Sequence, residues 1–85
     1  MIYSFKPSAL RDLRKLPRPV QKKIIQKLDF YTASANPLVF AKALADRRYG
    51  EYRFRAGDYR IIFDVDAKRR AIVVLAVGNR KDIYK

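Results

Sequence analysis

The segment from residue 51 to residue 65 reads EYRFRAGDYRIIFDV, with polar and apolar residues alternating on both sides of Gly57-Asp58. This period of two is typical of strands that bury one face. Glycine permits the positive φ that a two-residue hairpin turn requires, and aspartate tolerates it. We therefore predict two antiparallel strands joined at Gly57-Asp58, in which Ala56 pairs with Tyr59, Arg55 with Arg60, Phe54 with Ile61 and Arg53 with Ile62.

This pairing sorts the side chains of the hairpin onto two faces. Like charges that lie opposite each other in a sheet cost about 0.2–1 kcal/mol per pair, and arginine is well suited to a two-pronged grip on phosphates and carboxylates. We therefore favour an anion-binding surface on the basic face over a solvated face with no ligand. A slip of one residue in the pairing would separate the arginines. The apolar face carries Tyr52, Phe54, Ala56, Tyr59, Ile61 and Phe63, and the basic face carries Arg53, Arg55 and Arg60.

The C-terminal part of the chain adds a third strand and a polar tail. Residues 71–77 are apolar at every position, which predicts a central strand covered on both faces. Gly78 ends this strand. The tail that follows, residues 79–85, contains Arg80, Lys81 and Tyr84.

The N-terminal half supplies a short strand and two helices. Residues 1–5 form the strand, and the helices are predicted from Pro7 to about Leu16 and from Pro19 to Ala33, separated by two prolines. Residues 38–44 should form a loop or short turn over the edge of the core, and residues 46–50 a connecting loop. The whole chain, residues 1–85, is thus expected to be a single α+β domain. It would have a small antiparallel-rich four-stranded sheet in the order β-α-α-β-β-β, a two-helix hairpin packed on one face and a short C-terminal tail.

Composition narrows the class of partner and of chemistry. The formal net charge is +12, from 20 basic and 8 acidic residues, which indicates a polyanionic partner such as nucleic acid or an acidic protein. An anionic membrane would be a third such partner. However, no apolar run reaches the length of about 20 residues that spans a bilayer, and the basic residues lie in strands as well as helices, unlike those of a basic helix that lies on a membrane, so we expect no membrane partner. The absence of cysteine fits a cytoplasmic protein. The absence of both cysteine and histidine, with few acidic residues, predicts no metal site and no cofactor.

Two segments carry a resemblance to a known family. Residues 52–63, YRFRAGDYRIIF, and residues 77–84, VGNRKDIY, are similar to the RelE/ParE superfamily of toxins from bacterial and archaeal toxin–antitoxin pairs. The resemblance extends over the whole chain in length and element order, and it implies the same α+β fold. In the RelE branch, it implies an endoribonuclease that cuts messenger RNA in the ribosomal decoding site, using the 2′-hydroxyl of the RNA as nucleophile.

Carried over position by position, the resemblance assigns roles to residues of the basic face and the tail. The implied catalytic residues are Arg60, Arg80, Tyr84 and Arg55. The implied RNA-binding residues are Arg53, Arg55 and Lys81. Arg53 and Arg55 stand where some RelE relatives have lysine, which can lose its proton where arginine effectively cannot. If the family's base lies there, Tyr84 or the ribosome must supply it in this chain.

Two other functions fit the same resemblance. In the ParE branch the fold binds DNA gyrase and cuts nothing, and a degenerate toxin would act only with its antitoxin as a co-repressor. The set of Arg60, Arg80 and Tyr84 favours the RelE reading. The implied partners are an acidic antitoxin whose flexible segment folds on the basic surface, messenger RNA and the ribosome, and, together with the antitoxin, operator DNA.

Overall fold

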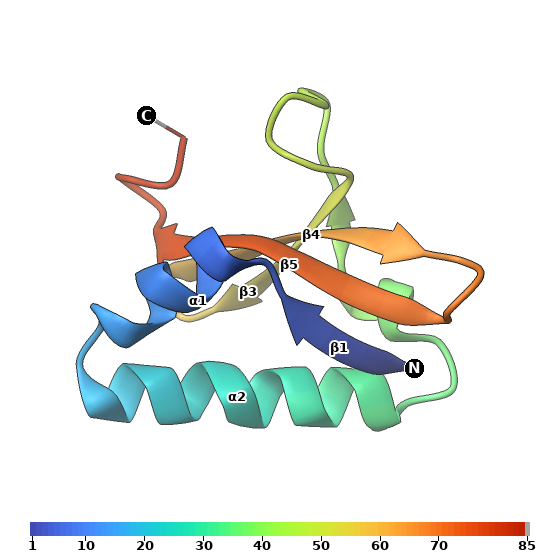
Figure 1. Cartoon of the computed structure of the whole chain (residues 1–85), viewed down its shortest axis with the longest axis horizontal. Coiled ribbons are helices and arrows are strands. Elements are labelled where there is room, and N and C mark those ends of the chain that lie inside the picture. Colours follow the sequence, from blue (N-terminus) through green and yellow to red (C-terminus); the bar gives the residue numbers. More distant parts are fainter. Residues whose placement is uncertain (85) are drawn as a thin grey trace.

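Two helices cover one face of a five-stranded mixed sheet in the computed structural model, which describes residues 1–84 (Figure 1). The strands lie in the order β1-β5-β4-β3-β2, with β1 parallel to β5 and every other pair antiparallel. The predicted α+β class and the two-helix layer are therefore confirmed. The elements are β1 (Ile2–Phe5), α1 (Pro7–Arg14), α2 (Arg18–Ala33), a 3₁₀ turn η1 (Pro37–Phe40), β2 (Lys42–Ala43), β3 (Tyr52–Ala56), β4 (Tyr59–Asp66) and β5 (Ala71–Asn79).

The β3–β4 hairpin has the predicted register. Ala56 pairs with Tyr59 and Arg55 with Arg60, so the turn consists of Gly57 and Asp58. Gly57 has a φ of 63°, the left-handed conformation that glycine adopts without the steric penalty of a side chain. The arrangement of side chains on the two faces of the hairpin follows directly from this turn.

The sheet has one more strand than the sequence predicted. β2 spans only Lys42 and Ala43, which pair with Arg53 and Tyr52 at the edge of β3. Two residues are too few to produce the alternating pattern by which strands are recognised, so this segment was expected to be a loop. The backbone N–H of Leu44 continues the pairing by donating to the Glu51 carbonyl at 2.9 Å.

The helices and the inner face of the sheet enclose the core. α1 ends at Arg14, two residues before the predicted end, and α2 begins at Arg18, one residue before the predicted start. The buried residues follow the helical and strand periods read from the sequence. From the helices they include Ala9, Leu13, Ile24 and Leu28, and from the strands Phe54, Ile61, Phe63, Ile72 and Val74. None of the helices between residues 1 and 84 is long and apolar enough to cross a membrane.

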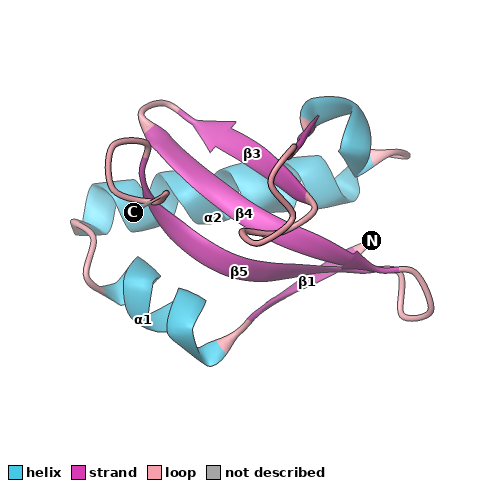
Figure 2. Cartoon of the chain, turned by 90° about the horizontal axis from the view of Figure 1, so that it is seen from above, coloured by secondary structure: helices cyan, strands magenta, loops and turns pink. Residues whose placement is uncertain are grey.

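The outer face of the sheet is covered in part by loops rather than by a helix. In Figure 1, the loop before β3 and the tail after β5 both rise from the side of the sheet opposite α2, and Figure 2 looks down on that side. On β5, Ile72 and Val74 are buried on the helical face, whereas Val73 and Leu75 are half-buried. The apolar run therefore does form a central strand, although its outer face is only partly covered. The predicted end at Gly78 is wrong, because β5 continues through Gly78 to Asn79, which pair with Arg60 and Tyr59 of β4.

Candidate anion-binding site on the outer face of the sheet

Four arginines and a tyrosine gather at one end of the outer face, and we call this set the arginine face: Arg53, Arg55, Arg60, Arg80 and Tyr84. The register of β3 and β4 places Arg55 directly opposite Arg60, with Arg53 two residues away on the same side of β3. The predicted grouping of these three side chains on one face is thus confirmed. Arg80 and Tyr84 join them from the tail.

Arg60 is the buried member of the arginine face. Its side chain is only 7% exposed, which is rare for an arginine without an acidic partner. Its Nη1 donates to the backbone carbonyls of Gly57 at 3.0 Å and Tyr59 at 3.3 Å. The ion pairs found among residues 1–84 involve Arg47, Arg48 and Arg69 instead, all outside this set.

The electrostatics of Arg60 reveal which groups lie near it. Burial lowers the pKa of Arg60, and the charges of Arg55, Arg53 and Arg80 lower it further, in that order, whereas Tyr84 raises it. Because a guanidinium effectively cannot lose its proton in a protein, Arg60 keeps its charge at neutral pH. A buried cation surrounded by further cations is a strong attractor for an anion.

The Gly57 carbonyl fixes the relative position of two guanidinium groups. It accepts from Arg60 Nη1 at 3.0 Å and from Arg55 Nε at 3.4 Å. Arg55 is exposed and Arg53 half-buried, so a ligand can reach both. The donors that remain on these side chains can bind the oxygens of a phosphate or stabilise charge that develops on them.

A short turn brings the tail back toward the sheet. The Asn79 carbonyl accepts from the backbone N–H groups of Asp82 at 2.9 Å and Ile83 at 3.0 Å, and the Arg80 N–H donates to the Asp58 carbonyl at 2.9 Å. These bonds tie the start of the tail to the tip of the β3–β4 hairpin. The Asn79 side chain also accepts from the Lys81 N–H at 3.0 Å. Lys81 itself is exposed and is not among the charges that act on Arg60.

Tyr49 is a contributor that the sequence analysis missed. Its hydroxyl donates to the Tyr84 carbonyl at 3.0 Å, and the two rings meet edge to face with centroids 5.1 Å apart. Residues 46–50 were expected only to connect two elements, and they do form a loop. A tyrosine next to two arginines in that loop, Arg47-Arg48-Tyr49, was the one signal available in the sequence.

The residues present limit the chemistry of the site. The chain contains neither histidine nor cysteine, and no three acidic residues within residues 1–84 are grouped closely enough to hold a metal ion. What the arginine face offers is charge stabilisation by guanidinium groups and a phenol that can stack or exchange a proton. This combination suits chemistry on a phosphate whose reactive groups belong to the ligand itself.

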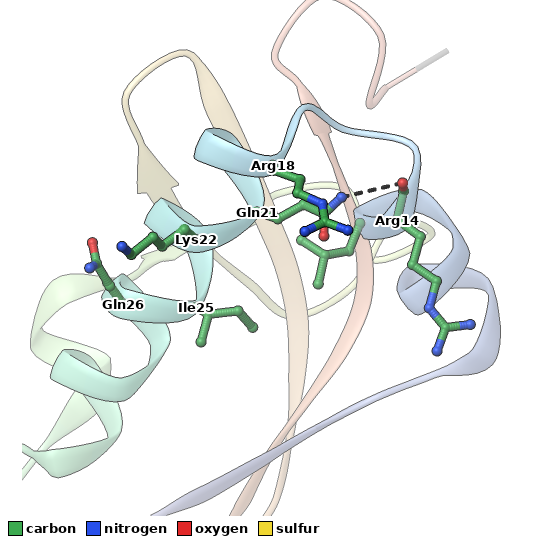
Figure 3. Close-up of a pocket in the computed structure, with 7 residues that line it drawn as sticks. Arg14, Arg18, Gln21, Lys22, Ile25 and Gln26 are labelled. Atoms are coloured by element: carbon green, nitrogen blue, oxygen red, sulfur yellow. Dashed lines mark hydrogen bonds between the residues drawn. The ribbon is translucent and has the colours of Figure 1, made fainter.

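A second basic surface lies on the helical side of the molecule. A groove of about 710 Å³ between α1 and α2 has apolar walls from Leu13 and Ile25 and a basic rim from Arg14, Arg18 and Lys22 (Figure 3). The Gln21 side chain bridges the two helices by donating to the Arg14 carbonyl at 3.3 Å. The rim arginines and lysine are exposed, as solvated helix residues usually are. We place the candidate site at the arginine face because, within residues 1–84, Arg60 is the one buried cation and it has no acidic partner there.

Comparison with known proteins finds similarity to toxins of toxin–antitoxin systems. A family model described as the ParE toxin of the type II toxin–antitoxin system parDE matches residues 3–84. Toxin RelG of Mycobacterium tuberculosis is 33% identical over 81 residues, which cover 95% of this chain and 92% of RelG. A chain in the crystal structure of the toxin–antitoxin complex RelBE2 from the same species aligns with a TM-score of 0.78 and 30% identity, covering 93% of this chain and 96% of that one. The isolated Escherichia coli RelE toxin shares the fold, with a TM-score of 0.70 and 23% identity over 98% of this chain and 89% of its own.

Proposed function

The chain belongs to the RelE/ParE family of toxins from type II toxin–antitoxin systems, and we propose that it is a ribosome-dependent endoribonuclease that cleaves messenger RNA. The observation that carries this proposal is Arg60, a buried guanidinium that has no acidic partner in the described part of the chain and lies beside Arg55, Arg80 and Tyr84. Such a group is suited to an oxyanion that appears during reaction.

The proposed reaction uses the RNA's own nucleophile. The 2′-oxygen of the cleaved nucleotide forms a bond to the adjacent phosphorus as the bond from phosphorus to the 5′-oxygen of the next nucleotide breaks. The proton of the 2′-hydroxyl is lost, and the leaving 5′-oxygen gains one. The products are a 2′,3′-cyclic phosphate and a 5′-hydroxyl, so the enzyme needs to align the two oxygens and to stabilise the added negative charge.

Each member of the arginine face has a place in this reaction. Arg60 and Arg80 stabilise the charge on the phosphate, and Arg55 supports Arg60 from the same carbonyl anchor. Arg53 and Lys81 bind flanking phosphates. Tyr84, which is 37% exposed, orients the RNA by stacking or exchanges a proton with it. Arginines at positions 53 and 55 cannot act as a base, so cleavage depends on Tyr84 and on groups of the ribosome.

The principal alternative is inhibition of DNA gyrase without cleavage, as in the ParE branch. The name of the matching family model and the two arginines in place of lysine favour it. The relative named RelG and the RelBE2 structure favour the RelE branch. Arg80 and Tyr84 are close enough to Arg60 to affect its pKa, and this grouping supports cleavage, because a toxin that only binds a protein has no need of a buried cation among further cations.

The proposed partner in the resting cell is an acidic antitoxin. RelBE2 was solved as a toxin–antitoxin complex, and the charge of +12 on this chain suits a flexible acidic segment that folds on binding. The complex would also bind the operator DNA of its own genes. The toxin itself would act in the cytoplasm, on translating ribosomes.

Two parallel assays separate these functions. Purified toxin is added to translating ribosomes with a defined message, and separately to gyrase in a supercoiling assay. We expect cut message and unaffected gyrase. Arg60→Ala and Arg80→Ala should each lower the cleavage rate by about 10²–10³, the usual effect of removing one charge-stabilising donor, with antitoxin binding retained. If the message stays intact and gyrase is inhibited, the nuclease proposal is wrong and gyrase inhibition, as in the ParE branch, is the function. If the toxin binds its antitoxin but affects neither the message nor gyrase, co-repression together with the antitoxin is the function that remains.

A further inference from the structure

Tyr84 lies five residues beyond the end of β5, and its position depends on a contact far away in the sequence. The backbone hydrogen bonds of the tail extend from Arg80 to Ile83, whose N–H donates to the Asn79 carbonyl at 3.0 Å. Within residues 1–84, Tyr49 gives Tyr84 a hydrogen bond of 3.0 Å to its carbonyl and an edge-to-face ring contact with centroids 5.1 Å apart. Without them the end of the tail would be free to fray, as chain termini commonly do.

The loop that carries Tyr49 is held firmly on the sheet. Gly50 has a φ of 150°, and a Cβ at this position would lie 2.7 Å from Ile62 Cγ2 and 3.0 Å from Leu75 Cδ1. The backbone therefore approaches the outer face more closely than any other residue type would allow. Tyr49, the preceding residue, is fixed in place by this close approach.

The carboxylates of Glu51 and Asp64 hold the C-terminal end of the loop against β4. The Glu51 N–H donates to Asp64 Oδ1 at 2.9 Å, and the Val65 N–H donates to Glu51 Oε1 at 2.8 Å. At the N-terminal end of the loop, the Asp46 carboxylate accepts hydrogen bonds from the backbone N–H and the guanidinium of Arg48. Tyr49 thus projects from a preorganised loop toward Tyr84, which follows the last hydrogen-bonded turn of the tail.

We propose that Tyr49 is a positioning residue, which holds Tyr84 beside Arg60 so that the phenol meets the RNA in a fixed orientation. This inference rests on the proposed nuclease function for its catalytic consequence, but its structural part stands independently. Tyr49 touches Tyr84 rather than the reacting phosphate, so its loss should slow the chemical step without weakening RNA binding. A tyrosine that merely stabilised the loop would not produce that pattern.

The catalytic test is a double-mutant cycle. Tyr49→Ala removes the ring and the hydrogen bond, and Tyr49→Phe removes the hydrogen bond alone. A neutral hydrogen bond and an aromatic pair together correspond to about a 10-fold or slightly larger effect. We expect Tyr49→Ala to lower kcat by about this factor with KM unchanged, Tyr49→Phe to recover part of the loss, and Tyr49→Ala to have no further effect in a Tyr84→Ala background. Tyr3→Phe is the matched control, because it removes a phenol that donates to Asp29 at 2.7 Å, outside the arginine face.

A second readout does not require cleavage. Backbone ¹⁵N relaxation of residues 80–84 in the isolated toxin reports the order of the tail. Order in wild type and Tyr3→Phe, with increased motion in Tyr49→Ala, supports the positioning role even if wild type cuts no message, an outcome that would refute the nuclease function alone. Unchanged tail order in Tyr49→Ala would overturn the inference. A loss of kcat of equal size in the presence and absence of the Tyr84 ring would overturn it too.

Discussion

Replacement of Arg60 by methionine should lower the cleavage rate by about 10²–10³ and at the same time stabilise the fold. Arg60 is 7% exposed and lies directly opposite Arg55 in the register of β3 and β4. A group kept buried and charged next to other cations serves the ligand rather than the fold. Functional sites commonly carry such a stability deficit, and methionine keeps an unbranched apolar stem while it removes the charge.

The magnitude follows from the contacts of the guanidinium. The cross-strand pair with Arg55 costs about 0.2–1 kcal/mol, and burial of the ion adds a desolvation penalty that its hydrogen bonds only partly offset. On the other side, the Tyr59 carbonyl loses the hydrogen bond from Arg60, which costs at most about 1 kcal/mol, whereas the Gly57 carbonyl still accepts from Arg55. We expect a net gain of about 1 kcal/mol at low ionic strength, which is roughly 4–8 °C in Tm for a domain of this size.

Thermal unfolding at low and high salt tests this expectation. The gain should shrink at about 1 M salt, where the Debye length is about 3 Å and the repulsion is screened in the wild type. Arg69→Met is the control, because it removes the same charge from an exposed position that is paired with Asp66 at 3.7 Å. A variant at position 60 that unfolds well below wild type at both salt concentrations would show that Arg60 is a structural residue, and the reasoning would be refuted.

Three further outcomes are expected. The isolated toxin should bind single-stranded RNA with little sequence preference and with an affinity that falls steeply as salt rises; filter binding at several salt concentrations measures the slope, and a flat dependence would remove the electrostatic account. The antitoxin should raise the Tm of the toxin by ligand linkage, and tight binding of the antitoxin at high salt to an Arg53→Ala, Arg55→Ala double variant would place its contacts elsewhere. The pKa of Tyr3 is raised to about 12 by burial and by its hydrogen bond to Asp29, so the folded state favours the protonated phenol. The raised pKa of Tyr3 stabilises the folded state fully below the unfolded pKa of about 10, and this stabilisation is lost as pH rises toward 12. Denaturant titrations between these pH values should therefore show a smaller fall in the free energy of unfolding for Tyr3→Phe than for wild type. Equal falls would contradict the assignment.

The hairpin was predictable because local chemistry determines it. Gly57 adopts a φ of 63° without the steric cost that a side chain would add. The alternation of polar and apolar residues on both sides of this turn then places Arg53, Arg55 and Arg60 on one face. The two helices were predictable for a similar reason, since their apolar stripes and prolines are local signals. Their ends differed from prediction by one or two residues, as helix ends commonly do.

The features that the sequence did not reveal depend on contacts between distant residues. β2 forms because Lys42 and Ala43 pair with the edge of β3. A segment of two residues is too short to show an alternation of polar and apolar residues. The burial of Arg60 goes against the usual exposure of arginine and results from the packing of its neighbours. The contact between Tyr49 and Tyr84 joins residues 35 positions apart, which no local pattern encodes.

The central claim is that the arginine face supports attack by the 2′-hydroxyl of messenger RNA, and removal of that single oxygen tests it most directly. Ribosomes are programmed with one of two messages. The first contains ribose throughout, and the second has a 2′-deoxy nucleotide at the position in the decoding site where cleavage is expected. The account predicts that wild-type toxin cuts the first to fragments ending in a 2′,3′-cyclic phosphate and a 5′-hydroxyl, and leaves the second intact. Cleavage of the deoxy message at the same rate, or failure to cut either message while the toxin is folded and binds its antitoxin, would contradict it.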